Sequence, residues 1–448
     1  MKAYKIPLLA GLLILSACTA NPILQDAKVS VEIPDKWSSI ASQYKDFKIT
    51  WLEGFKDPLM LALIEEGRNN NPDLILAAGN MNKAWLLAAK SATSLMPSAD
   101  LSLGQSSEGT STVKLTANWE LDVWGRISAG NSAAEASAKA AEADYIFTQQ
   151  SISANIAKLY FKIVEANLQT DLAKKNLAIS KETIRITKVK YDNGISSGQD
   201  LALSRANLAA SEEQVIRLAG SQKDAMRALE ILLGRYPSAS LESSKILPAL
   251  PANPPAGLPS ELLERRPDLI SAEQKIAAAF NAGLEAKAAS LPRFSLTANG
   301  SGASSSLAGA LNPSDLAWQM GANLIAPLFD GGRRKIDIKL ANLEQKQSIA
   351  NYAKIALNAF AEVENNLDQG IVLKQRELAL IQVQIQSHKA YRIAKIRYDE
   401  GEIDLLEPLT LQNQANAAES NLSSVRRSLL EQRINLYLAL GGAWQTAK

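Results

Sequence analysis

Two residue types that often carry chemistry occur once each in this chain of 448 residues: Cys18 is its only cysteine and His388 its only histidine. One histidine leaves too few ligands for a histidine-based zinc site and no base for a Ser-His-Asp triad. No H-E-x-x-H string or phosphate-binding P-loop string is present. A single thiol also excludes a disulfide framework. We therefore predict no catalytic residues, no metal site, no cofactor and no enzymatic activity.

The thiol of Cys18 directly follows a short apolar run at the start of the chain. Lys2 and Lys5 precede the mainly apolar residues 6–15. This run is too short to span a bilayer, which takes about 20 residues as a helix. A positive start, a short apolar stretch and small residues behind it are typical of a secretory signal.

Leu15-Ser16-Ala17-Cys18 resembles the bacterial lipobox. That resemblance implies a signal peptide at 1–17, acylation of Cys18 with chains such as palmitate, and a lipid-anchored segment at 18–54. Two or more acyl chains make such an anchor stable. Thr19 stands where an aspartate would imply inner-membrane retention, so the outer membrane is favoured. The alternative is an ordinary signal peptide with an incidental cysteine.

Charge and hydropathy narrow the classes of partner. The chain carries 48 basic and 46 acidic residues, a formal net charge of +2, which gives no general attraction to nucleic acid. Beyond the start of the chain, no stretch is apolar for long enough to predict a transmembrane helix. Membrane spanning, if present, must then use a β-barrel.

Short landmarks in the first half of the chain recur in the second half. The offset between them is 195 residues at first and 207 later. The recurring pairs are Asn71–Leu74 with Arg266–Leu269, Leu121–Arg126 with Leu328–Arg333, and Tyr191–Gly194 with Tyr398–Gly401. A constant offset across several landmarks predicts an internal duplication.

The duplication divides the chain into a first repeat at 55–247 and a second at 266–442. Between them lies a proline-rich connector, 248–265, with a short helix near 260–265, because prolines cannot continue a helix. A tail at 443–448 follows the second repeat.

Each repeat is predicted to contain a helix, two strands and two long helices. The strands are expected where apolar and polar residues alternate. These stretches are about 99–107, 112–121, 294–303 and 317–328. The turn in the second pair is expected to be longer by 12 residues, the change in the offset. Trp119, Trp124 and Trp318 lie near strand ends, as interfacial aromatic residues do. The alternative is a small soluble hairpin packed on the helices.

Two proline-free stretches, 125–191 and 332–398, predict unusually long helices. Apolar residues recur along them at spacings of three and four, which is typical of coiled-coil seams. The seam positions are Ile152, Ile156, Leu159 and Ile163 in the first helix and Ala356, Phe360, Val363, Leu367 and Ile371 in the second. At 1.5 Å per residue, about 67 residues make a rod of roughly 100 Å.

Four strands per chain cannot close a membrane barrel, since the smallest barrels have about eight. An open sheet edge is not stable in lipid, so several chains must share one barrel. A dimer would fill its lumen with side chains, whereas a trimer would leave a channel. The expected fold is therefore mixed and mainly α: long coiled-coil helices and a β-barrel shared by a trimer.

Four stretches closely resemble the outer membrane factors, the TolC-like channels of tripartite efflux systems. They are Trp51–Leu59, Leu115–Arg126, Leu262–Leu269 and Phe329–Arg333. The similarity spans nearly the whole chain and is closest to the lipoprotein branch. It implies a homotrimer with a 12-strand outer-membrane barrel and helices that cross the periplasm. It also implies two protein partners, a periplasmic adaptor and an inner-membrane pump such as an RND transporter, besides outer-membrane lipid.

The resemblance assigns roles to the two helix turns. It implies that the turns carrying Tyr191, Asp192 and Gly194, and Tyr398, Asp399 and Gly401, are tips that dock the adaptor. The same residues also end helices, because glycine adopts the positive φ that a helix end requires.

A closed gate is implied just past Gly401. The family pinches its pore with apolar and acidic side chains, and Leu406 and Glu407 fall at those positions, with Asp404 nearby. Where a second aspartate is usual stands Thr410, and no arginine follows closely, so the family's carboxylate–arginine link is in question. The alternative is an acidic helix start that complements the helix dipole.

The function predicted from sequence is a passive exit duct for small molecules, and the sequence does not identify its cargo. One alternative is a lipid-anchored coiled-coil protein that spaces the envelope layers without conducting. An envelope hydrolase is the other, and the single histidine argues against it.

Overall fold

The computed structural model describes residues 51–254 and 259–442. The expected signal peptide, Cys18, most of the segment 18–54 and the tail 443–448 lie outside the described residues. The elements are, in order, η2 (Trp51–Phe55), α1 (Pro58–Asn70), α2 (Pro72–Thr93), β1 (Ser98–Gln105), β2 (Ser111–Leu121), α3 (Arg126–Asp192), α4 (Gly198–Leu232), α5 (Pro259–Arg265), α6 (Pro267–Ala288), β3 (Arg293–Ser304), α7 (Leu307–Ala310), η3 (Pro313–Asp315), β4 (Ala317–Ile325), α8 (Arg333–Asp399) and α9 (Leu406–Ala439).

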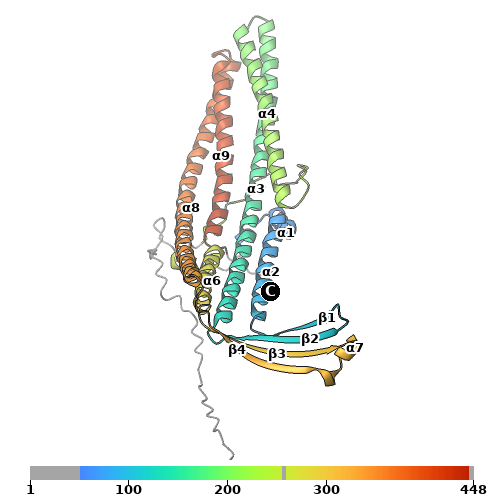
Figure 1. The fold of residues 1–448 in the computed structure, drawn as a ribbon. Coiled ribbons are helices and arrows are strands. Elements are labelled where there is room, and N and C mark those ends of the chain that lie inside the picture. The colour runs from blue at the N-terminus through green and yellow to red at the C-terminus, as the bar shows by residue number, and fades with distance from the viewer. Residues whose placement is uncertain (1–50, 255–258, 443–448) are drawn as a thin grey trace, which may run out of the picture.

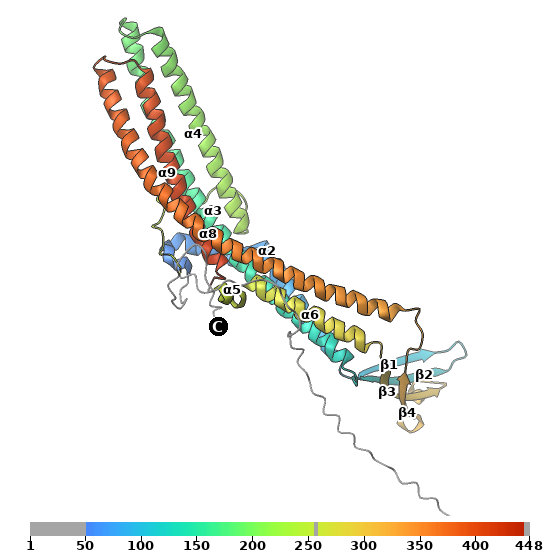
Figure 2. The ribbon, with the colours of Figure 1, turned by 90° about the vertical axis from the view of Figure 1, so that its left-hand side faces the viewer.

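The molecule is elongated, with its sheet at one end and its helix turns at the other (Figure 1). Helices α3 and α8, of 67 residues each, run from the sheet to the far turns, a length of about 100 Å at 1.5 Å per residue. Helices α2 and α6 lie beside them near the sheet, and α4 and α9 lie beside them near the turns (Figure 2). In the described part of the chain, no helix is both long and apolar enough to cross a bilayer.

Local sequence explains where these helices begin. Proline occupies the first turn of α1, α2 and α6, where its missing N–H has no intrahelical partner to lose. The two long helices start instead at Gly125 and Gly332, which have φ of 70° and 89°. That left-handed backbone lets the chain turn abruptly from strand to helix, and it favours glycine.

The duplication is visible in how each repeat closes on itself. Asn71 caps α2 and donates its Nδ2 to the carbonyl of Leu232, at the end of α4, over 2.8 Å. At the equivalent position, Arg266 donates Nη1 to the carbonyl of Ala439, at the end of α9, over 3.1 Å. Both side chains are buried, at 1% and 4% exposure. One position, filled by two residue types, therefore performs the same closure in both repeats.

The 12 additional residues of the second repeat are distributed differently from the sequence-based expectation. The pair β1–β2 spans 98–121, or 24 residues, and β3–β4 spans 293–325, or 33 residues, so the hairpin takes nine. The other three lie between β4 and α8, where 326–332 replaces the shorter 122–125. Strand β4 ends at Ile325 rather than near 328, because Pro327 has no N–H for a strand ladder.

The largest apolar core lies midway along the helices. Tyr160 and Phe161 of α3 are fully buried there against Phe55 and Met60, which come from the start of the described chain. The predicted seams occupy this region and its counterpart on α8, with one departure: Ile371 is 42% exposed. Toward the turns the seams become polar, as in the Ser180–Ser211 hydrogen bond between α3 and α4.

Candidate functional site

The four strands form one antiparallel sheet in the order β1-β2-β3-β4. Because side chains alternate along a strand, the register fixes which residues share a face. One row across all four strands is Ala99, Ala117, Ala298 and Met320, and the next row on the opposite face is Asp100, Thr116, Asn299 and Gln319.

The complete register separates an apolar face from a polar face. The mainly apolar face comprises Ala99, Leu101, Leu103, Val113, Leu115, Ala117, Trp119, Leu121, Phe294, Leu296, Ala298, Trp318, Met320, Ala322 and Leu324, with Gly300, Gly302 and a polar row of Gln105, Ser111 and Ser304 at one end. The mainly polar face comprises Ser98, Asp100, Ser102, Thr112, Lys114, Thr116, Asn118, Glu120, Arg293, Ser295, Thr297, Asn299, Ser301, Gln319 and Asn323, with Gly104, Gly321, Ala303, Ala317 and Ile325 among them. Several large residues of the apolar face are exposed, with Leu101 at 63% and Met320 at 87%. A large exposed apolar surface marks contact with lipid or protein.

The three tryptophans expected near strand ends have separate environments. Trp119, late in β2, donates its indole N–H to the carbonyl of Leu95 over 3.0 Å. Trp318 is the second residue of β4 and is 60% exposed. Trp124 lies beyond β2, in the turn to α3. Each therefore lies close to the end of a strand.

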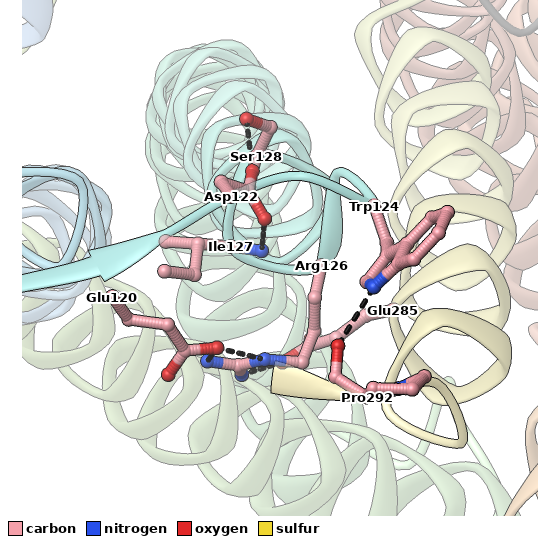
Figure 3. Close-up of polar contacts among 8 residues, drawn as sticks. All are labelled: Glu120, Asp122, Trp124, Arg126, Ile127, Ser128, Glu285 and Pro292. Atoms are coloured by element: carbon pink, nitrogen blue, oxygen red, sulfur yellow. Dashed lines mark hydrogen bonds and ion pairs between the residues drawn. The ribbon is translucent and has the colours of Figure 1, made fainter. Parts of the chain in front are cut away.

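The passage from β2 into α3 joins the two repeats through ionic and hydrogen bonds (Figure 3). Arg126 donates Nη2 to Glu120 of β2 over 2.9 Å, and its Nη1 lies 3.8 Å from Glu285 of α6. Trp124 donates its indole N–H to the carbonyl of Pro292, just before β3, over 2.7 Å. The sheet is thereby held in a fixed direction relative to the helices.

Asp122 caps the first turn of α3 at this passage. Its carboxylate accepts the backbone N–H groups of Ile127 and Ser128, each over 2.8 Å, and the Ser128 hydroxyl over 2.6 Å (Figure 3). Partial burial raises the pKa of Asp122, but the hydrogen bonds from Ser128 and Ile127 outweigh it and keep the pKa below its ordinary value.

Replacing this cap, Asp122→Ala, is expected to lower the free energy of unfolding by about 1 kcal/mol, as for other helix caps. The depressed pKa means that this stabilisation is present above the unfolded pKa of about 3.9 and is lost as the pH falls through the lower folded value. Denaturant unfolding at neutral pH and at about pH 2 measures both effects. A loss of stability in Asp122→Ala that is equal at both pH values would contradict this role of the carboxylate.

The far end of the molecule consists of two helix turns. In the α3–α4 turn, Gly194 has φ 72° and the Ile195 N–H reaches back to the carbonyl of Lys190 over 2.8 Å. In the α8–α9 turn, Gly401 has φ 78° and the Glu402 N–H bonds the carbonyl of Arg397 over 2.9 Å. Both turns therefore use the same glycine-ended geometry, which satisfies late helical carbonyls.

The predicted tip residues are placed at these turns. Tyr191 is 44% exposed, and Asp192 pairs with Lys188 over 2.7 Å. Tyr398 is partly buried, which raises the pKa of its hydroxyl, and the Lys190 ammonium lies 4.2 Å from its ring centroid. That cation–π contact links the end of α3 to the end of α8, so the two turns are adjacent.

The start of α4 differs from the start of α9. Ser197 and Asp200 form a reciprocal capping box at α4, with both hydrogen bonds at 3.1 Å. Burial raises the pKa of Asp200, but hydrogen bonds from Ser197, Ser196 and the Leu405 backbone outweigh it and lower this pKa. Helix α9 begins at Leu406, and its N-cap residue, Leu405, makes no side-chain cap. The two turns are thus secured unequally.

The α3–α4 turn also contains the string G-x-S-x-G, from Gly194 to Gly198, which the sequence-based exclusion of a hydrolase wrongly overlooked. In hydrolases that string joins a strand to a helix and presents its serine to a histidine. Here it joins two helices, and the Ser196 hydroxyl donates to Asp200 over 2.9 Å. His388 lies on α8, 3.5 Å from Glu419. The string therefore has a structural use in this chain.

The predicted gate residues gather at the α8–α9 turn. Leu406 is 49% exposed, whereas its neighbour Leu405 is buried. Asp404 accepts the Leu406 N–H over 3.1 Å. The turn also brings Arg397 to 3.8 Å from Glu407 and 3.1 Å from Glu402. Sequence reasoning searched for an arginine after the acidic group and missed this one, which precedes it and reaches it only through the turn.

Comparisons with known proteins agree with this geometry. The family model for outer membrane efflux proteins matches residues 63–235 and 258–442. A pyoverdine export outer membrane protein, OpmQ of Pseudomonas putida, is 31% identical over 88% of this chain and 88% of its own. The cation efflux protein CusC of Escherichia coli O6:H1 is 28% identical over 97% of both chains.

Comparison with solved structures also matches this chain to an outer-membrane channel. The solved structure of the outer-membrane channel OprN superposes with a TM-score of 0.83, at 28% identity, over 92% of this chain and 97% of its own. The family model covers well over half of the sequence, on both sides of the connector. The chain therefore belongs to the outer membrane efflux protein family.

Proposed function

We propose that three copies of this chain form one continuous duct that carries small molecules passively from the periplasm across the outer membrane. The protein is an outer-membrane channel component of an efflux system, as its family membership implies. The observation that carries the finer proposal is the sheet with one apolar and one polar face, mounted on helices of 67 residues.

The free edges of the sheet support the trimer. Strands β1 and β4 each pair on one side only, so unpaired N–H and C=O groups line both edges. Such groups are costly in lipid, where no water can satisfy them. If β4 of one copy pairs with β1 of the next, three copies close 12 strands. The apolar face then meets lipid, and the polar face, with Asp100 and Lys114, lines a wet lumen.

The proposed partners follow from the length of the helices and the position of the turns. A rod of about 100 Å extends far beyond a bilayer of roughly 40–45 Å, so the turns lie deep in the periplasm. There the turns at Tyr191–Gly194 and Tyr398–Gly401 would dock a periplasmic adaptor, below which an inner-membrane pump supplies the energy. Acylation at Cys18 would tether each copy to the outer membrane as well.

The gate is proposed at the α8–α9 turn. Leu406 would narrow the pore, and a threefold ring of Glu407, with Asp404 nearby, would favour cations. The contact between Arg397 and Glu407 ties the last turn of α8 to the first turn of α9 within one chain. Separating these two turns would open the pore, and loss of the contact would make that easier.

The cargo is expected to depend on the pump rather than on this chain. The relatives are named for different cargoes, pyoverdine for OpmQ and cations for CusC. No catalytic step is part of the proposal. A lipid-anchored spacer of the envelope would need neither an exposed apolar sheet face nor a polar face behind it, so the duct is the better explanation.

Conductance of the purified protein in planar bilayers tests the duct and its gate. Replacing Glu407→Gln should raise open probability about tenfold, because an exposed ion pair contributes about 0.5 kcal/mol in each of three chains and 1.4 kcal/mol is tenfold. Cation selectivity should fall as well. The matched control is Glu400→Gln, an exposed acid of the same turn with no ion pair among the described residues.

The outcomes separate the parts of the proposal. Equal currents in Glu407→Gln and wild type would keep the duct and move the gate away from Glu407. Absence of current from a protein that is also monomeric in detergent would reject the duct itself.

A further inference from the structure

A cavity of about 450 Å³ lies between α8 and α9, where the connector crosses them. The two helices are neighbours along this stretch (Figure 2). Its lining includes Leu367, Ile371, Lys374 and Leu378 of α8 and Gln432 and Arg433 of α9. Those from α8 recur at spacings of three and four and extend from 367 to 378, about 16 Å along the helix. The cavity is therefore elongated and has the volume of a small-molecule site.

Gly370 lies at the wall of this cavity, where α8 and α9 approach closely. Gly370 of α8 faces Gln432 of α9, and a Cβ at position 370 would lie only 3.0 Å from the Gln432 amide nitrogen. Ile371, which the helical periodicity predicts to be buried in the seam, is 42% exposed because it borders the cavity. The seam between α8 and α9 is buried at Val363 and Leu367, and it is buried again at Leu373 and Leu429, so the cavity lies beside a packed seam.

Arg433 lines the cavity and is the reason for expecting a ligand there. The side chain is 5% exposed, and its one hydrogen bond runs from Nη1 to the carbonyl of Pro251. Its Nε is buried without a partner, and none of the carboxylates in the described ranges is within ion-pair distance of its guanidinium. Burial lowers the pKa of Arg433. A buried charge without a counter-ion costs far more than a paired one.

Arg266 shows how the same fold treats a buried arginine that is satisfied. It is as buried as Arg433, at 4% exposure, yet it binds Asp268 and Glu362, each at 2.7 Å. Arg433 has no such carboxylate in the described chain. The difference between the two arginines indicates a missing anion at the cavity.

Two other polar residues of the cavity, Gln432 and Lys374, also offer groups that could bind a ligand with an anionic head. Gln432 donates its amide to the carbonyl of Asn366, while its Oε1 is buried without a partner. Lys374 adds a second positive charge at the cavity wall, held by Glu377 over 2.7 Å. The remaining wall is mainly leucine and isoleucine.

We propose that this cavity binds an amphiphilic anion with a single alkyl chain. A carboxylate or phosphate head group would pair with Arg433 and satisfy its free Nε, as charge-assisted hydrogen bonds do. A hydroxyl on the head group would satisfy Gln432 Oε1. The alkyl chain would lie along the leucines of α8 and α9 and remove them from water. A bound molecule would also hold the connector, through Pro251, against both helices.

Equilibrium dialysis of the full-length protein in lipid nanodiscs tests this proposal, with empty nanodiscs as the blank. Labelled decanoate and labelled decyl phosphate separate the two head groups, and decanol supplies the same chain without charge. The expected result is saturable binding of one anion per chain, at least tenfold tighter than decanol. Binding should fall at least tenfold in Arg433→Gln.

Matched variants keep the test decisive. Arg376→Gln removes an exposed arginine of α8 that does not line the cavity and should bind as wild type does. Gly370→Leu leaves the Arg433 side chain in place, adds a side chain at the cavity wall against Gln432, and should also abolish binding. The comparison of decanoate with decanol needs no variant, so a folding defect cannot hide the answer. Equal binding of decanoate and decanol, or no saturable binding, overturns the proposal. If no anion binds and Arg433→Gln dissociates the trimer, a carboxylate of a neighbouring copy is the counter-ion and the proposal is rejected.

Discussion

Met320→Arg is expected to prevent assembly in the outer membrane, whereas Gln319→Arg, one residue earlier on the same strand, is expected to assemble normally. Met320 is 87% exposed on the apolar face, near the middle of β4. Placing an arginine at the bilayer midplane of a barrel costs about 2–4 kcal/mol, and a trimer would carry three. Gln319 lies on the polar face, where an arginine meets water.

Outer-membrane fractionation, followed by detection of trimers on unheated gels, measures this difference. Because the Met320 side chain is mostly exposed in the single chain, its replacement removes almost no contact with the core. A loss of trimer in Met320→Arg therefore reports on the environment of the apolar face. Equal assembly of the two variants would show that this face does not meet lipid.

The second large effect is expected from Arg266→Gln, which should lower the free energy of unfolding by about 3 kcal/mol, because breaking a buried ion pair leaves its partner charges uncompensated. Arg266 donates to Asp268 through Nε and Nη2, at 3.0 and 2.7 Å, and to Glu362 and the end of α9 through Nη1. Removing it opens the closure of the second repeat and leaves Asp268 largely buried without its counter-ion.

The neighbouring arginine supplies the control for this substitution. Arg265 pairs with Glu261 one helical turn away and is 47% exposed at its side chain. An exposed pair of this kind is worth about 0–1 kcal/mol, so Arg265→Gln should barely change unfolding by denaturant in detergent. Similar destabilisation by both variants would mean that the ion pairs of Arg266 do not secure the repeat.

Periodicity and duplication were enough to predict the fold class from sequence. Alternation marked all four strands, and proline-free stretches marked the two long helices, because both signals depend on residues that are close in the chain. The offset of the landmarks predicted two repeats, and the structure shows them closing through Asn71 and Arg266. The recognised stretches added the family, which the comparisons confirm.

The features that sequence reasoning missed all depend on contacts between distant residues. Arg397 and Glu407 are ten positions apart and meet only because a turn reverses the chain between them. The G-x-S-x-G string looks catalytic until the turn around it is known to join two helices. Ile371 is exposed where it borders the cavity between α8, α9 and the connector, and the periodicity of α8 alone does not contain that fact.

The two helix turns of the duplicated chain differ in how the helix that follows each of them is capped. The α3–α4 turn has the capping box of Ser197 and Asp200, while Leu405, at the start of α9, makes no side-chain cap and the Leu406 N–H is bound by Asp404 instead. After a duplication, one copy of a motif can keep a stabilising cap while the other copy loses it. In the proposed trimer, the two kinds of turn would alternate around the ring. Widening of the ring at the α8–α9 turns alone would leave the α3–α4 turns, and any contacts made there, in place.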